Sequence, residues 1–384
     1  MSADVVAVLT YRTWADGHGN DDHTQLGQAL VNRLVEDVAV PSVTVVDPFR
    51  NWLKVLATPG DGRFDFPAGV RRRVDRPRRW ARGDPFGTDM LPAYRRLERR
   101  LRRQAGPGSV LISCHPVLAA VADRSAWADV VYYGWDDWRT EEDGIFAGAG
   151  GAIGWSYAQM AARDVNVVTV SQTLADRIGA RRSTVVPNGV DARAFESLPP
   201  VPAWFGSLSR RGPVALWVGA IESRVDAGAL AACARELGPA WSVVLVGPVV
   251  DPAPLEVLEG IPNVVVRGWH PRPEILAMVG AARVCLLPHV RRPATEAMSP
   301  LKLYEYLAAG RPTVASDLPP VRGISDRVLL VPPGGPYAPA VEAAARLPDQ
   351  TPEEIAAFRS ANDWTARYAQ FAQAALGALE VVTP

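Results

Sequence analysis

Lysine is almost missing from this 384-residue chain: Lys54 and Lys302 are the only lysines among 41 basic residues. The basic residues are balanced by 41 acidic ones, so the formal net charge is zero. That balance disfavours a globally basic nucleic-acid-binding protein, and we expect no nucleic-acid partner. A skew toward arginine usually reflects genomic base composition, so abundant arginine carries little information, whereas the position of Lys302 matters.

Cysteine is scarce too, and long apolar runs are missing. Cys114, Cys233 and Cys285 form neither a metal-like cluster nor a disulfide framework. No apolar run reaches the roughly 20 residues of a membrane-spanning helix, and the N-terminus lacks the basic start and apolar stretch of a signal peptide. We therefore expect a reduced, cytoplasmic protein, with peripheral binding at the inner face of a membrane left open.

Short apolar runs alternate with helical patterns along most of the chain. They are apolar on both faces, as parallel sheets covered by helices require. The predicted strands lie at 5–11, 42–48, 110–114, 129–135, 165–171 and 183–187, and then at 215–221, 242–248, 263–269, 283–289, 311–317 and 327–333. The segment 198–213, rich in proline and glycine, is predicted to be a linker. The pattern predicts two doubly wound α/β domains with a ligand cleft at the strand ends, and a helical tail over 352–379.

The familiar nucleotide-binding fingerprints are also missing. There is no G-x-x-x-x-G-K-[ST] loop, and the glycine-rich run 148–154 has neither the G-x-G-x-x-G spacing nor a preceding strand. We interpret that run as a loop and the start of a helix.

The most informative stretch is 288–319, where a polar loop leads into a helix predicted to begin at Pro300. The free N–H groups of its first turn, on Leu301 and Lys302, suit a diphosphate. Lys302 opposes the helix dipole there, and a bound phosphate would reverse that unfavourable interaction. Glu305 lies one turn further on and could reach sugar hydroxyls. The alternative is a solvated Lys–Glu pair on an ordinary helix.

The same stretch resembles the C-terminal signature of GT-B glycosyltransferases, in particular the large retaining family 4. The run YEYLAAGRPTVAS is similar to the family pattern E-A-M-A-x-G-x-P-V-V-A. Five more motifs occur in family order: VVPNGVD, ALWVGAIESRVD, VVLVGP, NVVVRGWHPRPEILAMVGAARVCLLPH and NDWTARYAQFAQ. The wording SPLKLYEYLAAG resembles most a subgroup of bacterial cell-surface polysaccharide and secondary-metabolite transferases.

The resemblance implies a GT-B fold: two Rossmann-like doubly wound parallel-sheet domains facing a cleft, with a C-terminal helix crossing back to the N-terminal domain. The expected bounds are 1–197 plus 364–384 for the acceptor-binding domain and 198–363 for the nucleotide-sugar-binding domain. It implies a retaining, metal-independent hexosyltransferase without a cofactor. The partners would be a nucleoside-diphosphate sugar of unknown base and a saccharide, lipid-linked or small-molecule acceptor, in cell-surface glycan or glycosylated natural-product biosynthesis.

The resemblance also implies donor-binding roles in the second domain. Glu305 matches the second glutamate of the family's E-x7-E pair, which binds the ribose, whereas the first falls at Ala297. The family's phosphate arginine falls at Ala220, and Arg224 is the only cation in that loop; its planar fork suits a leaving diphosphate, which Lys302 would also assist. The donor-binding set is completed by Gly219, Trp269, His289, Ser299 and Leu301. Trp269 could instead belong to the core, and His289 could be structural.

In the first domain, polar residues follow the predicted strands. Gly17 and Gly19 lie where family members have a glycine-rich turn close to the donor phosphates. Asp21 and Asp22 beside them could bind acceptor hydroxyls. No spacing there supports a metal site, and we expect none.

Two more strand ends of the first domain carry candidate residues. Several family members contact the transferred sugar with a histidine at the position of His115. Asp136 and Asp137 follow the strand at 129–135, where a carboxylate could orient an acceptor hydroxyl or stabilise an oxocarbenium ion. Adjacent residues of an extended chain point to opposite faces, so we favour Asp137 for catalysis and leave Asp136 as an acceptor contact. The alternative is a loop that caps the next helix.

Thirteen arginines and four acidic residues lie between Arg71 and Arg103. Apolar residues recur at helical spacing from Leu91 to Leu101, which predicts a basic amphipathic helix. Such a helix suits an anionic membrane face or an acidic, lipid-linked acceptor. The alternative is a helix that docks on the first domain and leaves its arginines in solvent.

Two other functions stay open beside the glycosyltransferase. A nucleotide-sugar 2-epimerase can share this architecture and would need no acceptor. A non-catalytic nucleotide-sugar-binding subunit is the third possibility, because Ala220 and Ala297 stand where the family has an arginine and a glutamate.

Overall fold

The structure is a computed structural model that describes residues 4–9, 29–37, 39–40, 42–51, 71–75, 78–79, 91–106, 108–140 and 148–377. The chain divides into two compact units. Unit 1 comprises Met1–Pro187 with Arg367–Pro384, and unit 2 comprises Asn188–Ala366. The expected boundary at 197/198 therefore lies inside unit 2, and the tail joins unit 1 at Arg367 instead of at Trp364.

Unit 1 is built on a seven-stranded parallel sheet with the order β4-β2-β1-β6-β7-β8-β9. Its strands are β1 (Val5–Val8), β2 (Ser42–Val46), β4 (Arg71–Asp75), β6 (Val110–Ser113), β7 (Asp129–Gly134), β8 (Asn166–Thr169) and β9 (Ser183–Val185). The short strands β3 (Arg50–Asn51) and β5 (Arg78–Arg79) form a separate parallel pair. The central strands β1, β6 and β7 are buried along their whole length because helices cover both faces.

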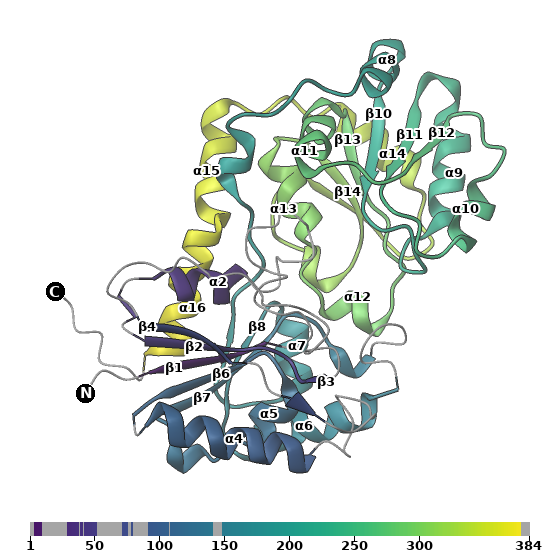
Figure 1. Ribbon diagram of the computed structural model, residues 1–384. Helices are drawn as coiled ribbons and strands as arrows, with labels where there is room; N and C mark the ends of the chain where they lie inside the picture. Colours follow the sequence, from purple (N-terminus) through teal and green to yellow (C-terminus); the bar gives the residue numbers. More distant parts are fainter. Residues whose placement is uncertain are drawn as a thin grey trace. The chain divides into compact units, whose positions relative to one another are not determined.

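Helices lie on both faces of this sheet (Figure 1). They are α2 (Ala29–Glu36), α4 (Leu91–Ala105), α5 (Pro116–Val121), α6 (Gly150–Ala162), α7 (Gln172–Ile178) and α16 (Trp364–Leu376), with the 3₁₀ turns η3 (Arg124–Ala126) and η4 (Trp138–Thr140). Alternation along β7 sets the two layers. Tyr132 contacts Tyr157 of α6, whereas Tyr133 contacts Phe371 of α16. The glycine-rich run 148–154 is the start of α6, as interpreted from its sequence.

The basic region of the sequence divides into two kinds of structure. Its first part contains β4, which the sequence analysis did not predict and which pairs with β2 at the edge of the sheet. Charged residues are common on edge strands because they discourage pairing with a second chain. Its last part is the predicted amphipathic helix, α4, whose Tyr94, Leu97 and Leu101 are buried. The helix therefore docks on unit 1 through its apolar stripe.

Unit 2 contains a six-stranded parallel sheet with the order β12-β11-β10-β13-β14-β15. Its strands are β10 (Val214–Val218), β11 (Ser242–Val246), β12 (Val264–Arg267), β13 (Val284–Leu287), β14 (Thr313–Ser316) and β15 (Val328–Val331). Alternation along β10 serves two cores. Ala215 and Trp217 belong to one core, and Leu216 and Val218 belong to the other.

The helices of unit 2 cover both of these cores. They are α8 (Ala203–Arg211), α9 (Ala227–Leu237), α10 (Ala253–Leu258), α11 (Arg272–Ala281), α12 (Pro293–Ala297), α13 (Leu301–Ala308), α14 (Tyr337–Ala345) and α15 (Pro352–Asn362), with the 3₁₀ turns η5 (Ala192–Phe195), η6 (Gly238–Ala240) and η7 (Pro319–Val321). Helix α9 packs in the core of Trp217, and α8 and α11 pack in that of Leu216. Of the helices that the structure describes, none has the length and hydropathy needed to cross a bilayer.

The prediction of a linker over 198–213 is wrong in part, because α8 lies within it. Pro202 precedes the helix and Gly212 ends it, which is where these residue types are compatible with a helix. Phe205 and Leu208, three residues apart, are buried in the second core of unit 2. The proline and glycine content of 198–213 thus led to a linker being predicted where the short amphipathic helix α8 lies.

The helical tail breaks at Asp363, close to the predicted position. Helix α15 begins with a capping box formed by Thr351 and Glu354. Helix α16 then packs on unit 1, where the Tyr368 hydroxyl donates to Asp37 at 2.7 Å and Asn166 donates to the Ala374 carbonyl at 2.7 Å. The tail thus completes the hydrophobic core of unit 1.

We expect Phe371→Ala to lower the free energy of unfolding of unit 1 by about 3–5 kcal/mol, because it empties a fully buried site against Tyr133. The urea midpoint, followed by tryptophan fluorescence, measures the change. Gln373→Ala, on the exposed side of α16, should shift it by only a few tenths of a kcal/mol. Equal shifts in the two variants would contradict the role of α16 in the core.

Candidate functional site

The candidate site lies at the carboxyl edge of the unit 2 sheet, between β10 and β13. The order of the strands reverses there, which makes this edge the topological switch point where open α/β sheets bind ligands. The loops that follow the two strands are bonded to each other. The Val290 N–H donates to the Arg224 carbonyl at 2.9 Å, and the Asp226 N–H donates to the Pro288 carbonyl at 2.8 Å. The two loops therefore form one platform.

Lys302 extends from the first turn of α13 onto the end of β10. Its Nζ lies 4.8 Å from the ring centroid of Trp217, within the range of a cation–π contact. Gly219 lies against the same amine, because a Cβ at this position would collide with Nζ and Cε of Lys302. Gly219 also has a φ of +145°, which L side chains rarely adopt. Glycine is thus required here both by its own backbone and by the lysine.

The buried amine of Lys302 has a lowered pKa. Burial, together with the nearby Arg224, lowers the pKa of Lys302 to about 8, although Glu222 and Glu305 act in the opposite direction. Arg224 is held by Glu222, with Nε at 2.7 Å and Nη2 at 2.6 Å from the same carboxylate oxygen. A lowered lysine pKa means that the surroundings disfavour the cation. A bound anion would relieve that cost.

The start of α13 is open at its amide end and anchored from behind. Pro300 is the N-cap residue and provides no side-chain cap for the first turn. Ser299 is bonded to Asn188 twice: its hydroxyl accepts from the Asn188 N–H at 3.1 Å, and its carbonyl accepts from Asn188 Nδ2 at 2.7 Å. Ser299, predicted to bind the donor, therefore holds the position of the helix start.

Glu305 is buried one turn into α13. Its Oε1 accepts from Nε of Arg272 at 3.2 Å and from Nη2 at 3.1 Å. The next residue, Tyr306, accepts the Val218 N–H at 2.9 Å through its hydroxyl, which fixes α13 to the end of β10. The carboxylate thus has a defined orientation, set by an arginine that the sequence analysis did not single out.

His289 and Trp269 differ in their environments. His289 is buried, and its Nδ1 has no hydrogen-bond partner among the described residues. Burial, with the charges of Lys302 and Arg224, holds its pKa well below the usual range, so the imidazole is neutral near pH 7. Trp269 is 68% exposed and belongs to no core. The core alternative for Trp269 is therefore wrong.

At the carboxyl edge of the unit 1 sheet, His115 follows β6. Its Nε2 lies 2.8 Å from the Tyr94 hydroxyl of α4, and the two rings stack with centroids 4.5 Å apart. Burial lowers the pKa of His115 to about 3, so the ring is neutral. His115 thus joins the sheet edge to the basic helix.

The two aspartates after β7 are arranged opposite to the expectation. Asp137, which we expected to face the site, is buried and pairs with Arg177 of α7 at 2.9 Å. It also accepts the Arg139 N–H at 3.2 Å, so it caps the following turn, the alternative that the sequence left open. Asp136 is the half-buried member of the pair. The physical reason is that a buried carboxylate needs a cation, and Arg177 supplies it.

Several predicted residues lie outside the described ranges: Gly17, Gly19, Asp21 and Asp22. Three contacts at the site were missed by the sequence analysis: Trp217 under Lys302, Asn188 behind Ser299, and Arg272 on Glu305. All three residues lie in motifs quoted above, Asn188 in VVPNGVD, Trp217 in ALWVGAIESRVD and Arg272 in the motif that begins NVVVRGW, but no spacing marks the contacts that they make. In the part of the chain that the structure describes, no group of three metal-ligating side chains comes together.

Two Rossmann-like parallel-sheet units, with a tail that returns from the second to the first, define the GT-B fold. The comparison with protein families agrees with this class. Residues 212–349, which contain Lys302 and the two bonded loops, match the family Glycosyl transferases group 1.

Known proteins are similar at two levels. TuaH of Bacillus subtilis (strain 168), which bears the name of a teichuronic acid biosynthesis glycosyltransferase, is 29% identical over 143 residues. That match covers 37% of this chain and only 36% of TuaH, about a third of its length. Among solved structures, HepE of Anabaena in complex with UDP and glucose has a TM-score of 0.62 at 13% identity and covers 97% of this chain and 98% of its own.

A second solved structure agrees over the whole chain. The α,α-trehalose 6-phosphate synthase of Burkholderia multivorans has a TM-score of 0.68 at 14% identity and covers 100% of both chains. At such identities the likeness shows the fold and nothing finer.

We expect Asn188→Ala to lower the free energy of unfolding of unit 2 by about 1–3 kcal/mol, because the buried Ser299 carbonyl would lose its amide donor. Differential scanning calorimetry measures the loss. Ser207→Ala serves as the control, since it removes only an exposed hydroxyl bonded to its own helix. If the two variants melt alike, Asn188 does not anchor the start of α13.

Proposed function

We propose that this protein is a glycosyltransferase that moves a sugar from a nucleoside-diphosphate sugar to an acceptor hydroxyl. The observation that carries the proposal is the Lys302 platform: an uncapped helix start, a lysine with a lowered pKa and an arginine, all at the switch point of a parallel sheet. The family match over 212–349 covers the same platform and supports the same activity.

The diphosphate is the ligand that best fits this chemistry. Amides at the start of α13, on Leu301 and Lys302, donate to phosphate oxygens and add the positive end of the helix dipole. Lys302 and Arg224 supply full positive charges. The guanidinium of Arg224, which contacts Glu222 in the free protein, can also donate hydrogen bonds to the phosphate oxygens. Gly219 leaves the space that the Lys302 amine occupies.

The remaining donor contacts follow from the neighbours of the platform. Glu305, oriented by Arg272, accepts hydrogen bonds from the ribose hydroxyls. Trp269 offers an exposed ring on which a base can stack. His289, neutral and buried beside both cations, offers a hydrogen bond to the sugar without adding a third charge. Uridine is the base that we favour, because HepE, with the same fold, binds UDP.

The chemical step is a displacement at the anomeric carbon. The bond from that carbon to the diphosphate oxygen breaks, and the acceptor oxygen forms the new bond on the same face. The proton of the acceptor hydroxyl passes to an oxygen of the departing diphosphate. Negative charge grows on the departing diphosphate, so fixed positive charge from Lys302, Arg224 and the helix start stabilises the transition state more than the ground state. We propose retention of configuration, on the resemblance to family 4.

Unit 1 supplies the acceptor site in this proposal. We assign the acceptor hydroxyl to Asp136, which is half-buried after β7, and a structural role to Asp137, which is buried and paired with Arg177. His115 acts as a neutral hydrogen-bonding group, since its pKa of about 3 excludes a charged ring near pH 7. The name of TuaH supports a cell-surface glycan as the biological context, and a lipid-linked acceptor would bring the protein to a membrane surface.

Nucleotide binding tests the proposal. We expect one of UDP, GDP, ADP and dTDP to bind in calorimetric titrations, and its sugar to support transfer to an acceptor. Gly219→Ala should weaken this binding about 10- to 100-fold, because it displaces the Lys302 amine from its position. Gly280→Ala, in α11 with open space around it, is the control and should bind normally. Full affinity in Gly219→Ala, or no nucleotide binding at all, would refute the proposed site.

The affinity for the nucleoside diphosphate should fall as the pH rises through about 8, because Lys302 loses its proton there. Binding should also take up protons near pH 8, since the anion favours the charged lysine. Calorimetry in two buffers of different ionisation enthalpy measures this uptake, and Lys302→Met should abolish it.

The free protein should respond to pH with the opposite sign. The folded pKa lies below the ordinary value of 10.5, so the unfolded chain binds more protons between about pH 8 and 10.5. Lys302 therefore makes the free energy of unfolding rise with pH across that window. If the affinity of the wild type for the nucleoside diphosphate stays level from pH 7 to 9, Lys302 does not bind the diphosphate as proposed.

A further inference from the structure

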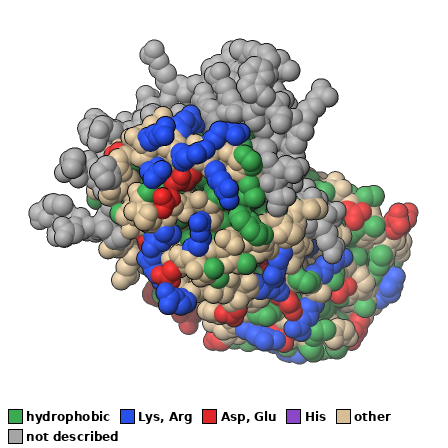
Figure 2. Space-filling model, turned by 90° about the horizontal axis from the view of Figure 1, so that it is seen from below, with side chains coloured by type: hydrophobic (Ala, Val, Ile, Leu, Met, Phe, Trp, Pro, Cys, Tyr) green, Lys and Arg blue, Asp and Glu red, His purple; other side chains and the backbone are tan. Residues whose placement is uncertain are grey.

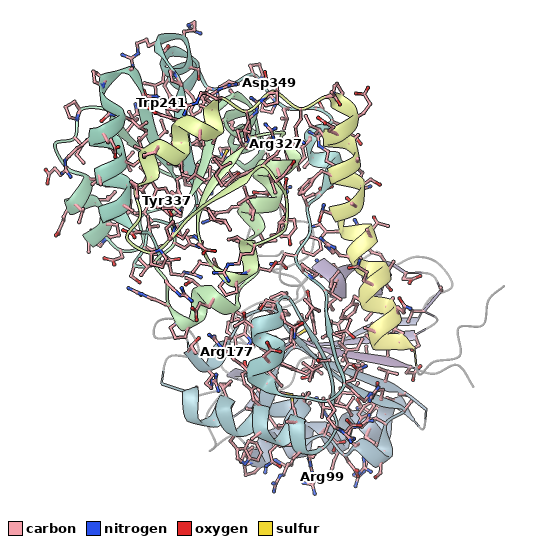
Figure 3. All side chains as sticks on the ribbon, turned by 180° about the vertical axis from the view of Figure 1, so that it is seen from behind. Arg99, Arg177, Trp241, Arg327, Tyr337 and Asp349 are labelled. Atoms are coloured by element: carbon pink, nitrogen blue, oxygen red, sulfur yellow. The ribbon has the colours of Figure 1, made fainter. Side chains whose placement is uncertain are left out.

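The outer face of α4 is a strongly charged surface of unit 1. Figure 2 shows Lys and Arg side chains gathered on the face of the molecule seen from below. Along α4, the exposed arginines are Arg95, Arg96, Arg99, Arg100 and Arg103. Figure 3 shows Arg99 at the outer rim of unit 1. We call these five side chains the arginine face.

The arginine face has little negative charge of its own. The one acidic residue of α4, Glu98, is buried and accepts from the indole N–H of Trp127 at 3.0 Å. Asp123 on the neighbouring turn lies 3.6 Å from Arg102. Arg95, Arg96, Arg99 and Arg103 have no ion pair among the described residues, because the nearby carboxylates are used elsewhere.

The general abundance of arginine does not explain this arrangement. Several arginines elsewhere have a carboxylate beside them, as for Arg322 with Asp317 and Arg291 with Glu296, whereas others, such as Arg193 and Arg211, stand singly in solvent. On α4 the arginines lie beside one another. Arg95 with Arg99, and Arg99 with Arg103, are like-charge pairs four residues apart, which destabilise an isolated helix. A bound polyanion would turn each of these repulsions into an attraction.

The arginine face is hollowed as well as charged. Two grooves of about 540 and 430 Å³ lie along α4. The charged and polar residues that line the larger one are Arg95, Arg96, Glu98, Arg99 and Arg102 from α4, Asp123 from the following turn, and Gln159 and Arg163 from α6 and its end, with Trp155 beside them. The five arginines outnumber the two carboxylates. Arg163 is fixed there by a bond of 2.8 Å to the Ala120 carbonyl. The half-buried Trp155 adds an aromatic surface among the charges.

The spacing of the charges points to an elongated ligand. Side chains four residues apart on a helix are separated by about 6 Å along its axis, so the arginines form rows and do not converge on one point. A single phosphate would need converging donors. A flat membrane would not enter the grooves, and none of the large apolar side chains found exposed in the described residues belongs to α4. A chain with repeated negative charges fits both the rows and the grooves.

We propose that the arginine face binds a polyanionic saccharide chain, with carboxylate groups repeated along it, as the extended part of the acceptor. This inference rests on the proposed function, because it names the class of acceptor that the glycosyltransferase would hold while it adds a sugar. The Tyr94–His115 contact joins the underside of the same helix to the sheet edge that carries Asp136. Binding on α4 would therefore place the acceptor chain on the unit that we propose to hold its reacting end.

The experiment compares three probes on the full-length chain: a polygalacturonate fragment, a dextran fragment of matched length, and vesicles of phosphatidylglycerol and phosphatidylcholine in equal parts. We expect the polygalacturonate to bind with an affinity that falls as salt is added, and the dextran not to bind. Arg96→Gln, Arg99→Gln and Arg103→Gln combined should weaken that binding about tenfold, because three exposed ion pairs are lost. Glutamine preserves the helix propensity of arginine.

A matched control variant separates the arginine face from net charge. Arg193→Gln, Arg211→Gln and Arg235→Gln combined remove three exposed arginines from unit 2 and change the net charge equally. This control should bind polygalacturonate like the wild type. Equal weakening in both triple variants, no binding of polygalacturonate, or binding to vesicles alone would overturn the proposal, and the last result would identify a membrane as the partner.

Nucleoside diphosphate binding keeps the two proposals separate. The α4 triple variant should bind the nucleotide with wild-type affinity, since none of its changes lies in unit 2. If the wild type binds the nucleotide and not the polyanion, the inference about α4 fails and the glycosyltransferase proposal stands. If the wild type binds the polyanion and no nucleotide, the glycosyltransferase proposal fails.

Discussion

The amine of Lys302 depends on three elements that are far apart in the sequence, and the candidate site depends on that amine. Helix α13 supplies the lysine, β10 supplies the indole beneath it, and the turn after β10 supplies the one residue type that leaves room for it. Tyr306, one turn along the helix, bonds to the end of the same strand and fixes the distance between them. Since the cation is disfavoured where it lies, this packing stores a preference for an anion.

The strands and the main helices could be predicted from the sequence because the rule behind them is local. A run such as VVAV at Val5–Val8 or SVVLV at Ser242–Val246 is apolar on both faces, and only a parallel sheet between two helical layers buries both. The start of α13 was predictable for the same reason, since Pro300 and the apolar spacing after it are local signals. The GT-B class followed from the order of motifs.

The failures share a physical cause, because each depends on a partner chosen by tertiary structure. The pairing of Glu305 with Arg272 joins two helices, and no periodicity marks that arginine. Asp137 was expected to face a ligand, but Arg177 from α7 had already neutralised it. Strand β4 and helix α8 were missed for another reason. The charged residues of β4, and the prolines and glycines around α8, outweighed weak local patterns. The role of a charged residue thus depends on which side chain the tertiary structure places beside it.

A carboxylate partner also identifies arginines that serve structure. An arginine with a carboxylate beside it, such as Arg272 or Arg177, has its charge balanced in the free protein and orients its partner. A buried cation that its surroundings disfavour costs free energy until an anion arrives. Exposed like charges four residues apart on a helix repel each other until an anion lies between them. Lys302 in unit 2 is such a buried cation, and the rows of α4 in unit 1 carry such exposed charges. Lys302, Arg224 and the start of α13 converge on one point and suit a compact diphosphate, whereas the arginine rows of α4 suit a chain with repeated charges. The geometry of the cations therefore distinguishes the two anions, which the amino-acid composition does not.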